Sequence, residues 1–365
     1  MRVLHAPTNV GNQPWSLSRA ERRLGLESDL VVNYQTWFGF PADRVLGSLN
    51  GRSATELATR TFFGLTAPFR YDVLHYYFGR SLLYWDDLPN LNRLPFADLK
   101  LARRLGKKIF MTLQGCDARL AGISNKSNKF TPCSKGMCGA FETCISYLDA
   151  QREELIKTIL PNCSRVFYLN PELGNYVPHG TFIPYANVDI DAIAPAKAGH
   201  RKTPIVVHAP SDPGIKGTAL ILEALKEIKS RHPHKLKLVQ GMSHEDAMQI
   251  YRSADIVIDQ VLAGWYGGLA VEVMAMGKPV ACTIREADLQ FIPPAMRDEL
   301  PILTLRPNRL ADDLAEIFES RNQWSSIGLK SRKFVERWHH PDKIASAIIK
   351  LYQNPESSLE ITSEE

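Results

Sequence analysis

No run of 18 apolar residues occurs in the sequence, and no apolar stretch follows a basic N-terminus. The chain is therefore predicted to contain neither a membrane-spanning helix nor a secretory signal peptide. Cysteine is scarce, with six residues among 365. Without an export signal, these cysteines argue against a disulfide-stapled secreted protein, and we expect the protein in the cytoplasm.

Two further absences narrow the class of function. No GxGxxG motif follows the first predicted strand, Arg2–His5, which disfavours a nicotinamide-dependent dehydrogenase. No basic run carries interleaved aromatic residues, so we expect no nucleic-acid partner. What remains is an ordinary globular composition, 44% hydrophobic and 23% charged, on a chain long enough for two domains.

The excess of positive charge is confined to the first half of the chain. Residues 1–190 hold 22 Lys and Arg against 16 Asp and Glu, a net charge of +6, whereas residues 191–365 hold 22 against 23, a net charge of −1. Such an excess favours an anionic acceptor or peripheral association with an acidic membrane, which adds the inner face of the membrane as a location. A solvated basic surface without a partner is the alternative interpretation.

The most informative stretch of the sequence covers residues 251–282. Its pattern predicts a short buried strand over Ala254–Gln260, a glycine loop over Gly264–Gly268, and a helix over Leu269–Met276 that a Gly-Lys-Pro sequence ends. A strand, a glycine loop and a helix in this order offer the positive end of a helix dipole to an anionic ligand. The alternative interpretation is a βα unit of an α/β core with a glycine turn.

This stretch resembles the donor-site signature of retaining GT-B glycosyltransferases of the glycosyltransferase group 1 (family 4-like) type. Residues Val271–Val280 (VEVMAMGKPV) follow the helical and Gly-x-Pro-Val parts of that signature. The resemblance implies that Glu272 binds the donor ribose. The signature has a further glutamate where this chain has Gly264, so the usual carboxylate contact to the donor sugar is missing. The loop residues that the resemblance places against the donor are Gly264, Trp265, Tyr266, Gly267, Gly268 and Leu269.

The same resemblance extends to a phosphate-binding loop before the helix predicted over Ala219–Arg231. The family has Gly-Arg-Leu and then Lys-Gly here; Lys216 and Gly217 match the second part, and Ser211 stands at the arginine position. Together with Thr218, these residues are expected to bind the donor diphosphate, because a lysine near a helix N-terminus suits phosphate. We predict Lys216 and Glu272 as the catalytic residues, with a solvated lysine as the alternative for Lys216.

In the first half, the resemblance points to Gly11 and Gln114. Gly11 lies in the loop after the first strand, which in the family approaches the ligand. Gln114 follows the strand predicted over Lys108–Leu113, where the family commonly has a His-Gly dipeptide. An amide can hydrogen-bond a sugar hydroxyl but cannot take up a proton, so this position supplies no general base.

The densest cluster of cysteines comprises Cys116, Cys133, Cys138 and Cys144. Four thiolates in one polar segment could hold a structural zinc ion in a tetrahedral site. Because the spacing contains no CxxC pair, two alternatives stay open: free or weakly paired thiols, and an iron–sulfur cluster or redox disulfide.

These observations predict an α/β protein of GT-B architecture, with two Rossmann-like domains that face each other across a cleft. Residues 1–188 are expected to form the acceptor domain, including a cysteine-containing loop at 116–144. Residues 189–355 form the nucleotide-sugar donor domain, whose last helix crosses back, and residues 356–365 form a disordered tail.

The predicted function is a retaining glycosyltransferase, a hexosyltransferase, that moves a sugar from a nucleotide-sugar donor to a hydroxyl of a glycan or lipid-linked acceptor. Surface polysaccharide synthesis is the expected setting, and the resemblance implies that the chemistry requires no cofactor. One alternative is a non-catalytic partner subunit that binds a nucleotide sugar or glycan. Another is a sugar-nucleotide epimerase or hydrolase on the same fold, with an acid–base pair drawn from Asp117, Asp259 and His208.

Overall fold

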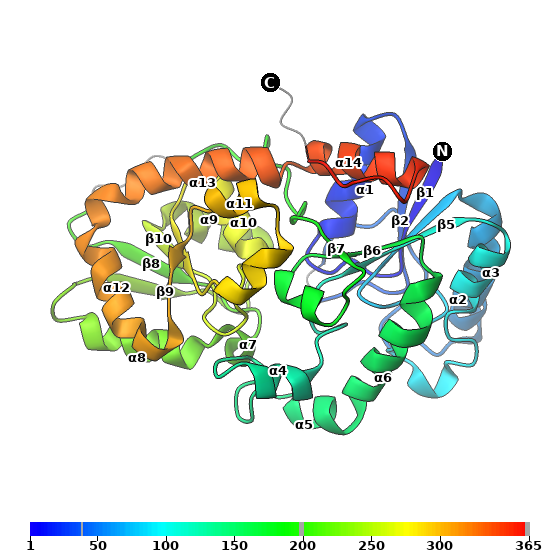
Figure 1. The fold of residues 1–365 in the computed structure, drawn as a ribbon, viewed down its shortest axis with the longest axis horizontal. Helices are drawn as coiled ribbons and strands as arrows, with labels where there is room; N and C mark the ends of the chain where they lie inside the picture. The colour runs from blue at the N-terminus through cyan, green and yellow to red at the C-terminus, as the bar shows by residue number, and fades with distance from the viewer. Residues whose placement is uncertain (38, 197–200, 362–365) are drawn as a thin grey trace. The chain divides into compact units, whose positions relative to one another are not determined.

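The computed structural model describes residues 1–37, 39–196 and 201–361. Internal contacts divide the chain into two compact units. The first consists of Met1–Arg119, Ala150–Asp189 and His340–Glu365, and the second of Leu120–Asp149 and Ile190–His339. Each unit has its own parallel sheet with helices packed against it (Figure 1). The predicted α/β class is confirmed.

The first unit is built on a seven-stranded parallel sheet in the order β3-β2-β1-β4-β5-β6-β7. The central strands are buried along almost their whole length, as expected where helices cover both faces of a parallel sheet. The order reverses between β1 and β4, so the loop after β1 lies at a topological switch point. The strands are β1 (Arg2–Ala6), β2 (Glu27–Val32), β3 (Arg44–Val45), β4 (Val73–Tyr77), β5 (Lys108–Leu113), β6 (Arg165–Tyr168) and β7 (Thr181–Phe182).

One long helix of this unit went unpredicted. Helix α2 begins after Ser53, whose hydroxyl oxygen accepts a hydrogen bond from the Glu56 N–H at 3.2 Å, while the same hydroxyl donates to the Glu56 carboxylate at 2.8 Å. The Ser-x-x-Glu sequence at this helix start is a recognisable signal that precedes an amphipathic run. The helices of the unit are α1 (Gln13–Arg23), α2 (Ala54–Arg70), α3 (Ala97–Arg104), α6 (Asp149–Glu154) and α14 (Pro341–Gln353), with short helical turns η1 (Pro89–Leu91), η3 (Leu155–Ile159), η4 (Leu160–Asn162) and η5 (Pro171–Asn175).

The C-terminal helix α14 belongs to the first unit. It packs beside α1, and Ile348 and Leu351 join a core with Phe110 and Phe167 of β5 and β6. In the tail after α14, Leu359 and Ile361 pack against the same core. Residues 362–365 of the tail that we predict to be disordered lie outside the described part of the chain.

The second unit is built on a five-stranded parallel sheet in the order β12-β11-β10-β8-β9. Its first strand, β8, pairs with β9 on one side and β10 on the other. The switch point of this sheet therefore lies between the carboxyl ends of β8 and β10, where doubly wound folds bind ligands. The strands are β8 (Ile205–His208), β9 (Lys235–Leu238), β10 (Ile256–Ile258), β11 (Val280–Cys282) and β12 (Leu303–Thr304).

A segment from the first half of the sequence also belongs to the second unit. Leu120–Asp149 carries Phe130 into the core formed by β8, β10, α8 and α12. The prediction assigned these residues to the first domain, whereas their contacts group them with the second unit. The helices of the unit are α4 (Ala121–Ser127), α5 (Phe141–Thr143), α7 (Pro213–Lys216), α8 (Thr218–Ile228), α9 (His244–Ser253), α10 (Gly268–Ala275), α11 (Pro294–Asp298), α12 (Leu310–Glu319) and α13 (Trp324–Trp338), with short turns η2 (Cys144–Leu148), η6 (Glu286–Phe291), η7 (Pro307–Arg309) and η8 (Arg321–Gln323).

The chain passes from the first unit to the second twice, after Arg119 and after Asp189, and returns after Asp149 and after His339. Part of the predicted linker, residues 197–200, lies outside the described residues. Among the helices that the structure describes, none combines the length and apolar character needed to cross a lipid bilayer.

Candidate functional site

The candidate site occupies the switch point of the second sheet. The loop after β8 contains Ser211 and leads through α7 to Lys216, and the loop after β10 runs from Asp259 to α10. Helix α10 starts at Gly268, one residue before its predicted start, and Glu272 therefore lies on its second turn. Both predicted donor loops thus converge at the edge of the sheet where parallel strands end.

A three-way contact joins the two loops. The Lys216 ammonium donates to Asp259 Oδ1 at 2.8 Å, and Asp259 Oδ2 accepts from the Gly267 N–H at 2.6 Å. The Asp259 side chain is fully buried and that of Lys216 is 13% exposed. A Cβ atom at position 267 would lie 3.1 Å from the Lys216 Nζ, so glycine allows this close approach. The ammonium is therefore held beside the backbone at the start of α10.

The position of Lys216 follows from its local sequence. The expected loop over Ala209–Thr218 contains a short helix, α7, whose first turn is capped by Asp212 Oδ1 accepting from the Ile215 N–H at 2.9 Å. Gly217 then adopts φ = 75°, and a Cβ there would lie 2.5 Å from a Val261 methyl group. Ser211, at the position of the family's arginine, is exposed before this turn. Lys216 is thus the last residue of α7, and Gly217 separates it from the start of α8.

Thr218 and His208 form a buried structural link. The His208 Nδ1–H donates to the Ile258 carbonyl at 2.8 Å, and Nε2 is 2.9 Å from the Thr218 hydroxyl, which donates to it. Burial lowers the pKa of His208, which keeps the ring neutral. The Thr218 hydroxyl is consequently occupied, and a contact from Thr218 to a donor would involve its backbone. His208 is equally occupied and supplies no acid–base group.

Glu272 is hydrogen-bonded to His244, which was not among the predicted catalytic or donor-binding residues. The distance from Glu272 Oε1 to His244 Nε2 is 2.7 Å, and the pair joins α10 to the first residue of α9. The hydrogen bond to Glu272 raises the pKa of His244, whose side chain is 48% exposed. The sequence Ser-His-Glu-Asp at the start of α9 is a local signal for a capped helix N-terminus. That His244 lies close to Glu272 is a result of the tertiary fold and has no such local signal.

Gly264 stands where the resembled signature has a glutamate, and the structure explains why. Its φ is 73°, in the left-handed region that disfavours a side chain. A Cβ atom there would lie 2.8 Å from Arg285 Cζ. The Arg285 N–H donates to the Gly264 carbonyl at 2.9 Å, and its guanidinium donates to Asp288 at 2.8 Å. The space next to residue 264 is thus filled by an arginine.

The aromatic residues of the loop point into the unit. Trp265 and Tyr266 are buried and stack with ring centroids 4.4 Å apart, and the Tyr266 hydroxyl is 2.8 Å from His339 Nε2. Their side chains therefore anchor the loop, and a donor contact would come from their backbone. The partly accessible residues of the loop are Gly267, Gly268 and Leu269, at the start of α10.

The two predicted positions of the first unit lie at the carboxyl ends of its strands. Gly11 adopts φ = 64°, and a Cβ there would meet nothing within 4 Å. The neighbouring Asn12 side chain donates to the Asn187 carbonyl at 3.0 Å. Gln114 is half-buried, and its Nε2 has no hydrogen-bond partner among the described residues. Gln114 therefore offers an unsatisfied donor at a strand end.

Asp117 has a structural role in the same loop. Its carboxylate accepts hydrogen bonds from the Gln114 N–H at 2.9 Å and the Gly115 N–H at 2.6 Å. Burial raises the pKa of Asp117, while these hydrogen bonds oppose the rise. The hydrogen bonds of the Asp117 carboxylate thus hold the turn that positions Gln114.

The cysteine cluster is divided between the units. Cys116 belongs to the first unit, whereas Cys133, Cys138 and Cys144 belong to the second. Within residues 1–37, 39–196 and 201–361, no group of three or more His, Cys, Asp or Glu side chains is arranged to hold a metal ion. Zinc stays a prediction that elemental analysis of the purified protein would test.

The cysteine-containing segment does touch the candidate site. A Cβ atom on Gly214, in α7, would lie 1.9 Å from the Met137 carbonyl oxygen. The backbone of the segment therefore packs directly on the turn that carries Lys216.

Comparison with solved structures identifies the fold. Sucrose-phosphate synthase from Thermosynechococcus elongatus matches with a TM-score of 0.60 and 16% identity, covering 97% of this chain and 99% of that one. A glycosyltransferase from Rickettsia africae matches with a TM-score of 0.60 and 14% identity, covering 98% of both chains. Anabaena HepE in complex with UDP-glucose matches with a TM-score of 0.58 and 12% identity, covering 95% of this chain and 98% of that one.

These similarities extend over almost the whole chain, and the predicted GT-B fold is confirmed. A protein assigned as a UDP-N-acetylglucosamine 2-epimerase from Listeria monocytogenes shares the architecture, with a TM-score of 0.54 and 11% identity. The match covers 99% of this chain and 98% of that one. No family model matches the sequence. No curated protein sequence matches it either.

Proposed function

We propose that this GT-B protein is a retaining glycosyltransferase that moves a hexose from a nucleotide-sugar donor to a hydroxyl of a glycan or lipid-linked acceptor. The observation that carries the proposal is the position of Lys216. Its ammonium, anchored by Asp259, lies beside the backbone of Gly267 at the positive end of α10. A cation and a helix N-terminus at the switch point of a doubly wound sheet suit a nucleotide diphosphate.

In this proposal, Lys216 and the start of α10 stabilise the negative charge that develops on the departing diphosphate. Glu272 accepts hydrogen bonds from the ribose hydroxyls, and His244 orients its carboxylate. The bond between the anomeric carbon and the diphosphate oxygen breaks, and the acceptor oxygen forms its bond on the same face of the sugar. The acceptor proton passes to the departing diphosphate. The mechanism invokes no metal ion or cofactor.

The first unit would contribute acceptor and sugar contacts. The unsatisfied Nε2 of Gln114 can donate to a sugar hydroxyl, and Gly11 leaves its loop open to a ligand. The net charge of +6 on residues 1–190 supports an anionic or lipid-linked acceptor. We therefore place the activity in surface polysaccharide synthesis, in the cytoplasm at the inner face of the membrane.

Thermal-shift measurements with UDP-, ADP- and GDP-sugars test the donor assignment. The UDP-glucose complex of HepE and the ADP complex of a starch synthase from Arabidopsis thaliana make uridine and adenosine donors the first choice. We expect one nucleotide family to raise Tm. At a ligand concentration of a hundred times Kd, binding adds about 2.7 kcal/mol to the free energy of unfolding. Glu272→Ala and Lys216→Ala should abolish the shift, whereas Glu245→Ala and Lys226→Ala, which change exposed residues of α9 and α8, should retain it.

NMR of the product tests the stereochemistry. Transfer that keeps the anomeric configuration of the donor supports the retaining mechanism, and an inverted product contradicts it. A folded protein whose Tm responds to no nucleotide sugar would overturn the donor assignment. Saturable binding without transfer to any glycan or lipid-linked acceptor would favour the non-catalytic binding subunit, which the replacement of the signature glutamate by Gly264 also supports.

A sugar-nucleotide epimerase is the second candidate. The hydrogen-bonded pair of His244 and Glu272 is an acid–base arrangement, and the epimerase from Listeria shares the fold. Epimerisation needs no acceptor. Incubation of UDP-N-acetylglucosamine with the protein alone, followed by NMR of the sugar ring, distinguishes the two: a new epimer indicates the epimerase, and unchanged substrate excludes this reaction.

A further inference from the structure

Helix α2 of the first unit has an outer face that is apolar over two turns. Phe62, Leu65 and Phe69 follow one another at helical spacing and are 63%, 38% and 64% exposed. The one charged residue in 57–69 is Arg60, which is buried and paired with a buried carboxylate. The solvent side of a helix ordinarily carries charged and polar residues, whereas this face exposes two phenyl rings and no charge.

Helix α3 packs beside α2 and exposes charge of one sign (Figure 1). Residues 93–108, which contain α3, hold six basic residues and one acidic residue. The acidic residue, Asp98, is fully buried, and its carboxylate accepts from the hydroxyls of Tyr76 and Ser81 at 2.8 and 2.7 Å. The charge that this segment presents to solvent is therefore entirely positive.

The positive charge of this segment is not neutralised by ion pairs. Arg103 donates to the side-chain oxygen of Asn162, and the Lys108 ammonium donates to the Gln353 carbonyl at 2.6 Å. Both acceptors are uncharged. Throughout the part of the chain that the structure describes, no carboxylate forms an ion pair with the exposed cations of α3, which are Lys100, Arg103 and Arg104.

The apolar face and the cations meet at one end of the sheet. Val73 of β4 pairs with Lys108 of β5, so the segments that lead into these two strands lie side by side. Arg70, the exposed last residue of α2, adds a cation at this end. One exposed carboxylate, Asp72, lies in the same segment and accepts from the Arg2 N–H at 2.8 Å. The cations of α2 and α3 outnumber it.

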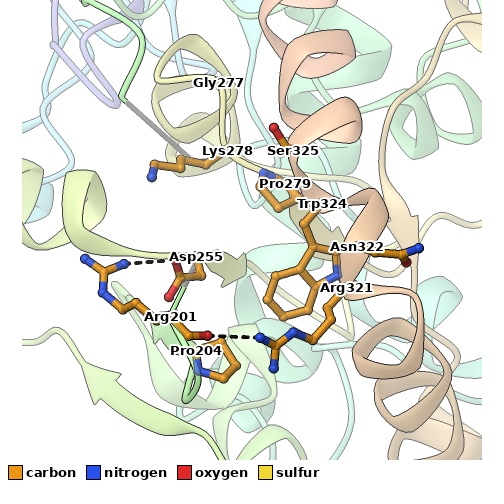
Figure 2. A pocket seen from close by; sticks show the side chains of 10 residues that line it. All are labelled: Arg201, Pro204, Asp255, Gly277, Lys278, Pro279, Arg321, Asn322, Trp324 and Ser325. Carbon is orange, nitrogen blue, oxygen red and sulfur yellow. Dashed lines mark hydrogen bonds and ion pairs between the residues drawn. The ribbon is translucent and has the colours of Figure 1, made fainter. Parts of the chain in front are cut away.

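The cations that line a pocket of about 360 Å³ in the second unit provide a contrast (Figure 2). The Arg201 guanidinium donates to the Asp255 carboxylate at 2.9 Å, and Arg321 donates to two backbone carbonyls at 3.0 and 3.3 Å. These arginines have acceptors within the protein. The exposed lysine and arginines of α3 instead leave a net positive charge on the surface.

The combination of rings and cations selects among partners. A nucleic acid or a small anion would pair with the cations but leave Phe62 and Phe69 in water. A second copy of the chain on this face would bring two positive surfaces together, which is unfavourable. A bilayer with acidic headgroups accommodates both features, because aromatic side chains enter the boundary between headgroups and acyl chains while cations stay at the lipid phosphates.

We propose that the outer face of α2 and the cations of α3 form a docking surface for a bilayer that contains acidic lipids. Phe62, Leu65 and Phe69 enter the interface, and Lys100 and Arg104 contact the headgroups. The inference rests on the proposed function for its setting, the inner face of the membrane, and it assigns that association to particular residues. These residues are not among those proposed to bind the donor.

Flotation of the full chain with lipid vesicles, in the absence of any nucleotide sugar, tests the proposal. The probes are vesicles of phosphatidylcholine alone and vesicles with about 30% phosphatidylglycerol. At about 0.1 M salt, we expect binding to the acidic vesicles to exceed binding to the neutral ones at least about tenfold. At about 1 M salt most of this difference should disappear, because the charges are screened.

A double substitution tests the apolar part of the surface. Phe62→Gln with Phe69→Gln should weaken binding to the acidic vesicles roughly tenfold or more, because two rings no longer leave water. Leu329→Gln is the matched control, since Leu329 is a 65% exposed apolar residue on α13 of the second unit. It should leave binding unchanged.

A second pair of substitutions tests the cations. Lys100→Gln with Arg104→Gln should weaken binding to the acidic vesicles about fivefold or more and reduce its dependence on salt. Lys330→Gln with Lys333→Gln, which removes two exposed charges from α13, should not. All the changed side chains are exposed, and the Tm of each variant verifies that it is folded.

Three results would overturn the proposal: no binding of the wild type to either kind of vesicle, equal binding to both kinds, and binding that both double variants of the first unit retain. A dimer in light scattering that Phe62→Gln with Phe69→Gln dissociates, without vesicle binding, would assign the face to a second copy instead. The shift of Tm by a nucleotide sugar should persist in every variant, so a failure of the donor assignment is recorded separately.

Discussion

The Asp259 carboxylate accepts a hydrogen bond from the Lys216 ammonium at 2.8 Å, across the switch point of the second sheet. The two residues are far apart in the sequence, and each follows a strand of the sheet, β8 or β10. Because the second oxygen of Asp259 accepts from the Gly267 N–H, one buried carboxylate fixes both the lysine and the start of α10. Asp259 is therefore a positioning residue for Lys216.

Replacing Asp259 by Asn tests this role. We expect Asp259→Asn to lower the free energy of unfolding by about 3 kcal/mol, because it breaks a buried ion pair and leaves Lys216 without its partner. Nucleotide-sugar affinity should fall roughly tenfold or more, since the ammonium loses its orientation. Urea unfolding and titration with the donor measure the two effects.

Asp298→Asn is the matched control, because Asp298 pairs with Arg297 at 3.1 Å on the surface with both side chains well exposed. This change should cost less than about 1 kcal/mol and leave donor affinity unaltered. A donor affinity in Asp259→Asn equal to that of the wild type would contradict the positioning role.

Restoring the signature glutamate should not restore a working site. We expect Gly264→Glu to destabilise the protein by at least about 1–2 kcal/mol, because of the left-handed backbone at residue 264. The contact of 2.8 Å between a Cβ and Arg285 Cζ adds to this cost. Thermal unfolding of the variant and of Gly136→Glu measures the difference.

Gly136 separates the two effects, because its φ is 83° but a Cβ there would meet nothing within 4 Å. Gly136→Glu therefore reports the backbone strain alone. If Gly264→Glu proved no more destabilising than Gly136→Glu, the steric role of Arg285 would be refuted.

The pair of His244 and Glu272 should make stability depend on pH. The hydrogen bond to Glu272 raises the pKa of His244 above its ordinary value of 6.5. A raised pKa in the folded state contributes stability that is fully present below 6.5 and is lost as the pH rises through the raised value. Glu272→Gln should therefore reduce stability relative to the wild type more at about pH 6 than at about pH 9.

An NMR titration of the histidine ring protons measures this directly. The His244 midpoint should lie above 6.5 in the wild type and move down in Glu272→Gln. The buried His208, whose pKa burial lowers, should show no comparable response to this substitution. An unchanged His244 midpoint in the variant would show that the hydrogen bond is not formed in solution.

The cysteine-containing segment should support the candidate site through its packing on α7. We expect Gly214→Ala to destabilise the protein by about 1–3 kcal/mol, because the added methyl group would overlap the Met137 carbonyl. Donor affinity should fall as well, since α7 carries Lys216. Chemical unfolding and donor titration provide the readouts.

Gly139→Ala serves as its counterpart in the same segment, because a Cβ at position 139 would meet nothing within 4 Å. It should change stability by no more than about 0.5 kcal/mol. Equal effects of the two substitutions would argue against a specific contact between the segment and α7.

Much of the fold was predictable because it rests on local patterns. Apolar runs such as Lys108–Leu113 mark strands buried in a parallel sheet, and the capped or glycine-ended helices between them mark βα units. Helix α2 was missed although the Ser53-x-x-Glu56 sequence is a recognisable signal for a helix start, and Ser53 caps the helix. The placement of Leu120–Asp149 was not predictable, since a contact such as that of Phe130 with a distant core has no local signature.

For the candidate site, the sequence singled out Lys216, Gly267 and Glu272 through the resemblance to a glycosyltransferase signature, whose glycine turn and helix start consist of adjacent residues. The partners of these residues required the folded chain. Asp259 meets Lys216, and His244 meets Glu272, only because parallel strands bring their carboxyl ends to one edge. The filling of the space at Gly264 by Arg285 is likewise a contact between residues distant in the sequence, and such contacts are set by packing rather than by local preference.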